Sequence, residues 1–255
     1  MFAEMFAFRD HALVDFVGGG GKTRLIRALA SEYSSRGPVL MTTTTRNHPP
    51  DPAEGVSVIS GDNVVLVREI VARIGRECAG RPYKLLAARH FFSPHLLRGV
   101  PPDFVEGLDR GLFPVLLNEA DGAAGFSLKL PRDSEPVPMR RSDYLVPVVG
   151  MDCLGRPLGP DTVFRWELFA GRFALRAGET ITPETAARIL MHPEGVCRAR
   201  EAETEIVPFI NKADSPAADA AARELGRAIL ENGHFPVSRV LYGSAAEGRV
   251  QCLQA

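Results

Sequence analysis

The stretch that decides the fold is LVDFVGGGGKTRLIRALASEY, which runs from Leu13 to Tyr33. Its first five residues are apolar apart from Asp15 and predict a buried strand. Four glycines follow at residues 18–21, and residues 22–33 then place apolar side chains at helical spacing. Glycine lets backbone N–H groups turn inward, and a helix start carries a positive partial charge. A strand, a glycine loop and a helix in this order therefore predict a site for phosphate groups.

The end of this loop has the residue types that nucleotide phosphates require. We expect Lys22 to reach the β- and γ-phosphates and the Thr23 hydroxyl to ligate Mg²⁺. The match to the pattern G-x-x-x-x-G-K-[ST] is incomplete, because Phe16 stands at its first glycine. A variant, K-G-G-x-G-K-[ST], belongs to nucleotide-driven metallocentre and cofactor maturation proteins, and Val17 stands at its first lysine here. A flexible glycine loop followed by a solvated lysine is the alternative. The glycines expected to hold phosphates are Gly18, Gly19, Gly20 and Gly21.

Beyond the glycine loop, strands and helices alternate along the chain. Further strands are expected at residues 39–43, 56–59, 113–117, 143–149, 205–210 and 236–242. Helices are expected at residues 63–74, 161–177, 183–191 and 215–231, and another near Pro101 and Pro102. This alternation predicts an α/β fold with a mostly parallel sheet flanked by helices, like that of the P-loop NTPases. We expect one domain over residues 1–255, in which the loop-rich residues 122–204 are a candidate inserted subdomain.

Composition places the chain among ordinary globular proteins and excludes several functional classes. Of its 255 residues, 45% are hydrophobic and 24% are charged, and the formal net charge is −1. This balance does not favour nucleic acid or an anionic membrane as a partner. The four cysteines lie far apart, so neither a zinc site nor a disulfide framework is expected. The first residues do not resemble a signal peptide and no apolar run is long enough for a membrane span, so we expect a cytoplasmic protein.

Two carboxylates follow the strand expected at residues 113–117. Glu119 and Asp121 come at its carboxyl end, which is the edge where ligands bind in open parallel sheets. A carboxylate there can hold Mg²⁺, directly or through a water, and can position an attacking water. We therefore assign Glu119, with Thr23, to the metal, and Lys22, Glu119 and Asp121 to catalysis. A turn capped by these acids is the alternative.

Two further polar motifs follow strands. NKAD, at residues 211–214, looks like the N-K-x-D base-recognition motif of GTP-binding proteins, in which the aspartate accepts hydrogen bonds from guanine. We assign Asn211, Lys212 and Asp214 to nucleotide binding, and a polar turn before a helix N-cap is the alternative. The threonines at residues 42–45 have two interpretations. They either reflect the preference of β-branched residues for strands, or supply a hydroxyl that contacts Mg²⁺ or the γ-phosphate. Arg46 is a further candidate for phosphate charge.

In their order along the chain, these motifs resemble one known family. FVGGGGKT (residues 16–23), LMTTTT (40–45), LLNEADGAAGFSLKLPRDSEPVP (116–138), VVGMDCLGRPL (148–158) and FINKAD (209–214) are similar to the YqeC family. Its members are described as accessory proteins of selenium-dependent molybdenum hydroxylases and look like P-loop proteins. The resemblance implies a molybdenum hydroxylase or its cofactor-processing proteins as partners, and it defines no reaction. Lys129, Arg132 and Glu135 then either contact a molybdopterin-like or selenium-bearing molecule or form a surface salt-bridge cluster.

The sequence therefore predicts a Mg²⁺-dependent protein that binds GTP or ATP, with GTP favoured by NKAD. The first hypothesis is an NTPase that drives insertion or modification of a molybdenum or selenium cofactor. The second is a carrier or scaffold that holds a nucleotide or a nucleotide-bearing cofactor without cleaving it. The third is a kinase or nucleotidyl transferase that acts on a small substrate. Three outcomes distinguish these hypotheses. Turnover of free GTP favours the first, retention of nucleotide without phosphate release favours the second, and phosphate transfer to an added compound favours the third.

Overall fold

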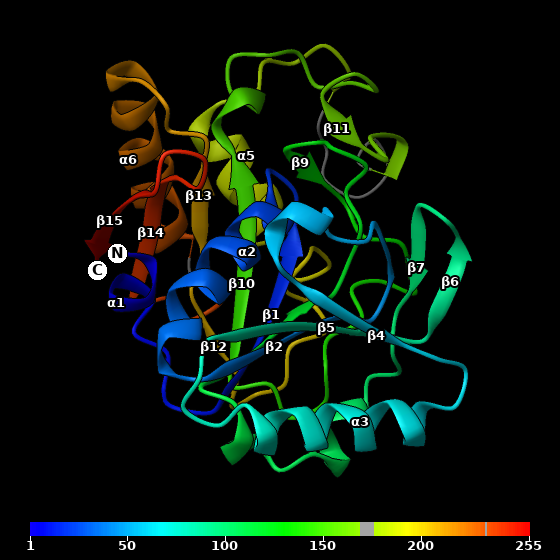
Figure 1. Cartoon of the computed structure of the whole chain (residues 1–255). Helices are drawn as coiled ribbons and strands as arrows, with labels where there is room; N and C mark the ends of the chain where they lie inside the picture. Colours follow the sequence, from blue (N-terminus) through cyan, green and yellow to red (C-terminus); the bar gives the residue numbers. More distant parts are fainter. Residues whose placement is uncertain (169–175, 233) are drawn as a thin grey trace.

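A mostly parallel central sheet flanked by helices organises the structure, a computed structural model that describes residues 1–168, 176–232 and 234–255 (Figure 1). Within the described residues, the strand order is β15–β14–β13–β10–β1–β8–β2–β5–β4, and β12 pairs with β10. Every pair is parallel except β14 and β15, which are antiparallel. The strands are β1 (Ala12–Gly18), β2 (Pro38–Thr43), β4 (Ser57–Ser60), β5 (Tyr83–Ala88), β8 (Val115–Glu119), β10 (Tyr144–Gly150), β12 (Glu205–Ile206), β13 (Phe209–Asn211), β14 (Arg239–Ser244) and β15 (Arg249–Gln254).

The helices cover both faces of this sheet. Val14 and Phe16 of β1 pack in one core cluster with side chains of α1 and α2. Leu13 and Val17 point to the opposite face. Leu13 joins a core cluster with side chains of α3, and Val17 joins one with side chains of α5 and α6. Alternate residues of one strand thus face different helices, as the pleat requires. The helices are α1 (Phe2–Phe6), α2 (Lys22–Tyr33), α3 (Val64–Glu77), α5 (Pro183–Leu190) and α6 (Pro216–Glu231).

The central strands explain why the sheet is parallel. Every residue of β1, β2, β8 and β10 is buried, because helices cover both faces. Such strands appear in the sequence as continuous apolar runs, and the helical crossovers between them keep neighbours parallel. The α/β class and the mostly parallel sheet predicted from the sequence are confirmed.

The parallel register gathers the polar strand ends at one edge. Phe16 of β1 lies opposite Glu119 of β8, and Thr43 of β2 lies on the other side of Glu119. On the far side of β1, Gly150 of β10 lies opposite Asn211 of β13. Residues far apart in the sequence therefore meet where the glycine loop leaves β1.

Two expected helices differ from the structure in the described residues. The first part of the helix expected at 161–177 is instead a short strand, β11 (Val163–Phe164), which pairs in parallel with β9 (Leu128–Lys129). Residues 167–168 are helical, and residues 169–175 lie outside the described residues. Val163 is fully buried, so long-range pairing and burial override the local helical pattern. The helix expected near Pro101 and Pro102 is replaced by two 3₁₀ turns, at Phe104–Gly107 and Arg110–Leu112.

The sequence did not predict several strands. β5 and β15 complete the main sheet, and β3 (Arg46–Asn47), β7 (Leu96–Arg98) and β6 (His90–Ser93) form a separate three-stranded sheet. The inserted subdomain expected at 122–204 stays a prediction, although those bounds include β10, a central strand. Among the helices that the structure describes, none has the length and apolar character needed to cross a membrane.

Candidate functional site

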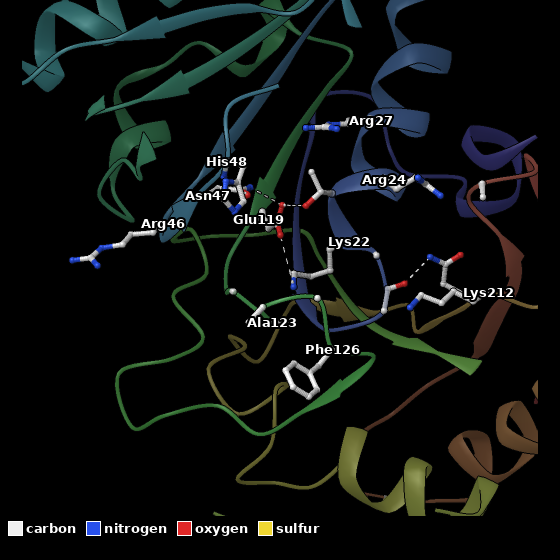
Figure 2. Close-up of a pocket in the computed structure, with 18 of the residues that line it drawn as sticks. Lys22, Arg24, Arg27, Arg46, Asn47, His48, Glu119, Ala123, Phe126 and Lys212 are labelled. Carbon is white, nitrogen blue, oxygen red and sulfur yellow. Dashed lines mark hydrogen bonds and ion pairs between the residues drawn. The ribbon is translucent and has the colours of Figure 1, made fainter. Parts of the chain in front are cut away.

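The carboxyl edge of the main sheet holds a cavity of about 720 Å³, which we call the edge cavity (Figure 2). Its wall comes from the glycine loop, the start of α2, residues 46–48, residues 122–126 and the ends of β13 and β14. Its volume is in the range of small-molecule sites. Five cationic side chains and two carboxylates line it, a surplus of three positive charges that favours a polyanion such as a nucleoside triphosphate. These residues are Lys22, Arg24, Arg27, Arg46 and Lys212, with Glu119 and Asp214.

Close backbone packing fixes the glycine loop against β10. A Cβ atom at Gly18 would collide with the carbonyl of Val148, and one at Gly20 would collide with the backbone of Gly150. Both glycines also have positive φ, 92° at Gly18 and 74° at Gly20, a region that other residues rarely adopt. Gly18 and Gly20 are therefore required by the fold itself.

Most N–H groups of the loop are bonded within the protein. Those of Gly19 and Gly20 donate to the carbonyls of Val148 and Phe126, both at 2.9 Å, and that of Gly18 donates to the Asp121 carboxylate at 3.0 Å. Residues 22–24 form the first turn of α2, so their N–H groups have no acceptor within the helix. Of the four glycines, Gly20 and Gly21 line the edge cavity. The donors available to a phosphate thus lie mainly at the helix start.

Lys22 is folded back onto the loop and is only 3% exposed. Its Nζ donates to the Gly18 carbonyl at 2.6 Å and lies 3.1 Å from an Asp121 oxygen and 3.8 Å from a Glu119 oxygen. Burial by itself would lower the pKa of this lysine, but the two carboxylates outweigh burial and raise it. Lys22 therefore stays charged, and a phosphate that enters the cavity competes with carboxylates for its ammonium group.

Glu119, at the end of β8, binds a hydroxyl and an amide. Its Oε2 accepts hydrogen bonds from Thr23 Oγ1 and Asn47 Nδ2, both at 2.8 Å (Figure 2). A hydroxyl beside a carboxylate is a donor set that suits Mg²⁺, which takes one or two protein oxygens together with waters and phosphates. The two residues predicted to hold the metal, Thr23 and Glu119, are thus brought together. Among the described residues no group of three or more His, Cys, Asp or Glu could hold a metal, so an ion here would need ligand oxygens as well.

Asp121 lies behind the loop and does not line the edge cavity. It is fully buried between two lysines, with Lys22 at 3.1 Å and Lys129 at 3.0 Å, and it accepts the Gly18 N–H. These contacts make Asp121 a positioning residue for Lys22. Its predicted catalytic role stays a prediction.

A buried chain of charges continues from Asp121 into the following loop. Lys129 is fully buried and lies 3.0 Å from Glu135, which also accepts two hydrogen bonds from Arg165, at 2.6 and 2.9 Å. Burial would raise the pKa of Glu135, but hydrogen bonds from Arg165 and Lys129 outweigh burial and lower it to about 2. The pairing expected for Lys129 and Glu135 is present, but it lies in the interior. Arg132 is exposed, and its backbone carbonyl accepts a hydrogen bond from Arg198.

The NKAD residues have three different environments. Asn211 joins two elements, because its Nδ2 donates to the Gly20 carbonyl at 2.7 Å and its Oδ1 accepts the Ala245 N–H at 2.9 Å. Lys212, whose φ is 65°, donates to Ser127 and pairs with Asp152, both at 2.8 Å. Asp214 is exposed and lines the edge cavity. The motif therefore fixes the glycine loop and presents one carboxylate to the cavity.

Three of the four hydroxyls of the threonine run are used by the protein. Thr42 donates to the Ala87 carbonyl at 3.1 Å, Thr43 to the Glu119 carbonyl at 3.0 Å, and Thr44 to the Val137 carbonyl. None of residues 42–45 lines the edge cavity. For residues 42–44, strand propensity therefore fits the structure better than a hydroxyl ligand for Mg²⁺ or the γ-phosphate.

Sequence reasoning missed several residues of the edge cavity. Asn47 contacts Glu119, and Arg24 and Arg27 extend from α2 toward the cavity (Figure 2). The arginines sit three residues apart on one helix, which is a signal of a shared face. Asn47 gave no such signal, because its position depends on a chain reversal after β2. Cys153, which the motif VVGMDCLGRPL contains, is buried, and burial raises the pKa of its thiol to about 12, which disfavours the thiolate that a nucleophile requires.

Comparisons with known proteins place this chain in a family. The family model described as YqeC protein matches residues 14–167, a range that includes the glycine loop and Glu119. The chain belongs to the YqeC family. It is 29% identical over 211 residues to a protein of Escherichia coli (strain K12) described as uncharacterized protein YqeC, covering 82% of this chain and 79% of that protein. No solved structure is similar enough to the chain to count as a match.

The family match covers only part of the candidate site. It ends at residue 167, before Asn211, Lys212 and Asp214. The glycine loop, Lys22 and Glu119 thus belong to the segment that defines the YqeC family. The residues assigned to the base come from the C-terminal third of the chain, which the sheet brings back to the same edge.

Proposed function

We propose that this YqeC protein is a Mg²⁺-dependent nucleoside triphosphatase that prefers GTP. The observation that carries the proposal is the convergence of Lys22, Thr23 and Glu119 at a helix start, inside a cavity with a surplus of positive charge. A buried lysine, a hydroxyl and a carboxylate are the groups needed for phosphates and their metal ion.

Each residue has a role that follows from its contacts. Lys22 leaves Asp121 for the β- and γ-phosphates, while the unpaired N–H groups at the start of α2 bind phosphate oxygens. Thr23 and Glu119 hold Mg²⁺, which when bound neutralises charge on the phosphates. Asn211 keeps Gly20 in place from the other side of the loop. Glu119 also orients the attacking water.

The guanine preference rests on Asp214. Its exposed carboxylate lies at the cavity wall near Lys212, whose stem can pack against a base. A carboxylate accepts hydrogen bonds from guanine N1–H and the 2-amino group, whereas adenine offers an acceptor at N1 and no 2-amino group. From the family resemblance, we propose that hydrolysis drives a step in maturation of a selenium-dependent molybdenum hydroxylase or its cofactor.

The test is calorimetric titration of the full chain with GTP and with ATP in the presence of Mg²⁺. Lys22→Ala should abolish binding of both nucleotides. Lys84→Ala is the matched control, because Lys84 lies in β5, donates to the Glu54 carbonyl and does not line the edge cavity. Unchanged affinity of Lys22→Ala would overturn the proposal.

Phosphate release then separates hydrolysis from the other two hypotheses. Free phosphate should appear from GTP with the wild-type chain and not with Lys22→Ala. Tight nucleotide binding without phosphate release would instead make the protein a carrier or scaffold. Transfer of the γ-phosphate to an added small compound would make it a kinase.

A further inference from the structure

The three-stranded sheet beside the main sheet carries three arginines on adjacent backbone positions. Its strands β3, β7 and β6 pair antiparallel, and Arg46 lies directly opposite Arg98. Arg89, which precedes β6, donates its backbone N–H to the Arg98 carbonyl at 2.9 Å. The three side chains therefore start from neighbouring points of one small sheet, on the right in Figure 1.

These arginines line a second cavity of about 370 Å³, which we call the arginine cavity. Phe92 and Thr45 are also in its wall, and no carboxylate occurs among the described residues that line it. The lining of the two cavities has one residue in common, Arg46. Figure 2 shows the Arg46 side chain extending away from Lys22. The arginine cavity is therefore a separate compartment beside the edge cavity.

The facing positions of Arg46 and Arg98 are electrostatically unfavourable. Like charges directly opposite each other on antiparallel strands destabilise the pairing. In the part of the chain that the structure describes, Arg46, Arg89 and Arg98 form no ion pair. The Arg46 guanidinium instead lies 4.5 Å from the centre of the Phe92 ring, a contact that neutralises no charge. An anion between the strands would remove this repulsion.

Two buried donors at the same cavity also lack acceptors. Arg89 Nε and Thr45 Oγ1 are both inaccessible to solvent and have no hydrogen-bond partner. Burying a donor without an acceptor is costly, so such groups call for an explanation. A bound oxyanion would compensate the arginine charges directly. The two donors, which are closed to solvent in the ligand-free chain, would reach it only after a small movement of their side chains.

We propose that the arginine cavity binds the phosphate group of a small phosphate monoester, a ligand distinct from the nucleotide and beyond the proposed function. A phosphate carries up to two negative charges and offers three terminal oxygens to planar guanidinium forks, whereas a carboxylate carries one charge and two oxygens. Phe92 is 58% exposed and gives the organic part of the ligand an apolar face. The size of the cavity limits that ligand to a small molecule.

The shape of the cavity depends on Gly99. A Cβ atom there would lie 2.5 Å from the Thr44 carbonyl carbon and 2.6 Å from the Thr45 nitrogen. The Val100 N–H, next along the chain, donates to the Thr43 carbonyl at 2.8 Å. Glycine thus lets the segment after β7 approach the end of β2 closely enough to form the cavity wall.

The test is calorimetric titration of the full chain with phenyl phosphate, without nucleotide, and with inorganic phosphate and sulfate at matched ionic strength. Arg89→Gln and Arg98→Gln should bind phenyl phosphate at least about tenfold more weakly than the wild type, since each loses a charged fork. Lys22→Ala, which alters the edge cavity, should bind it as the wild type does. So should Arg227→Gln, which removes one exposed arginine from α6. Phenyl phosphate should bind more tightly than inorganic phosphate or sulfate.

Other results would overturn the proposal. Loss of phenyl phosphate binding in Lys22→Ala, with Arg98→Gln unaffected, would place the phosphate in the edge cavity. Equal affinity for phenyl phosphate and inorganic phosphate, or for phosphate and sulfate, would contradict a monoester site. Because no nucleotide is added, failure of the GTP titration would affect the proposed function alone.

Thermal unfolding without ligand gives an independent readout. At low salt, Arg98→Gln should unfold at a temperature equal to or above that of the wild type, because it removes the repulsion with Arg46. Added salt should stabilise the wild type more than this variant, since salt screens the same repulsion. A lower unfolding temperature for Arg98→Gln would show that the protein itself satisfies this guanidinium, and would contradict an anion site.

Discussion

Replacing Lys22 by alanine should destabilise the ligand-free protein as well as abolish nucleotide binding. From the sequence, Lys22 stands at a helix start, where alanine is well tolerated. The structure places it instead among buried charges, 3.1 Å from Asp121, which is itself fully buried. Removing the lysine leaves a carboxylate in the interior with one cation fewer.

The magnitude follows from the contacts that remain. Leaving a buried charge without any partner costs about 3–5 kcal/mol. Asp121 keeps Lys129 at 3.0 Å and the Gly18 N–H at 3.0 Å, and Glu119 keeps its hydrogen bond from Thr23. We therefore expect roughly half of that cost, about 2 kcal/mol. For a domain of this size, such a loss lowers the unfolding temperature by about 4–8 °C.

The assay is thermal unfolding followed by circular dichroism, with a double-mutant cycle. Asp121→Asn removes the carboxylate charge, so Lys22→Ala should cost less in the Asp121→Asn background than in the wild type. A coupling free energy of at least about 0.5 kcal/mol is expected for groups in direct contact. An unfolding temperature of Lys22→Ala within about 1 °C of the wild type, or additive effects in the cycle, would refute the reasoning.

Three further predictions concern other carboxylates. Glu119→Gln should spare GTP binding but slow hydrolysis by about a hundredfold or more, because the group acts mainly on the transition state, and an unaltered rate of phosphate release would move that role elsewhere. The wild type should bind GTP at least about tenfold, or 1.4 kcal/mol, more tightly than ATP. Asp214→Asn should weaken the binding of GTP and strengthen the binding of xanthosine triphosphate. Equal affinities for GTP and ATP in competition binding would rule out the guanine preference. Burial raises the pKa of Asp15 from 3.8 to about 7 despite hydrogen bonds from Ser142, Asn118 and Met139, so the folded chain binds this proton more tightly than the unfolded chain. The stability that Asp15 contributes is full below pH 3.8 and is lost as the pH rises toward 7. In urea unfolding, Asp15→Asn should therefore gain stability relative to the wild type as the pH rises over that interval. A difference in the free energy of unfolding that does not change with pH would contradict the assignment.

The regular elements with strong local patterns were predictable. The helix expected at residues 22–33 is α2, and those expected at 63–74, 183–191 and 215–231 match α3, α5 and α6 within three residues at each end. The central strands β1, β8 and β10 appeared as apolar runs because both of their faces are buried. The strands that the sequence did not reveal are peripheral or mixed in composition. β5 is only partly apolar, and β11 exists because it pairs with β9.

The candidate site divides in the same way. Residue types and strand ends indicated Lys22, Thr23 and Glu119, because phosphate and metal chemistry needs those groups and parallel strands end at one edge. Residue spacing gave no signal for Asn47 beside Glu119 or for the three arginines of the small sheet. Those placements depend on short antiparallel strands after β2 and β5, which have too few residues to show a period.

By itself, then, the sequence determined the class of fold, the edge at which a ligand would bind and the chemical groups present there. Only the tertiary structure decided which of those groups meet. It set the ion pair between Lys22 and Asp121, and it set the hydrogen bond from Asn211 to Gly20, residues 191 positions apart in the chain. Local periodicity reports which face of an element is buried, but a contact across the sheet depends on strand order and register, which no local pattern encodes.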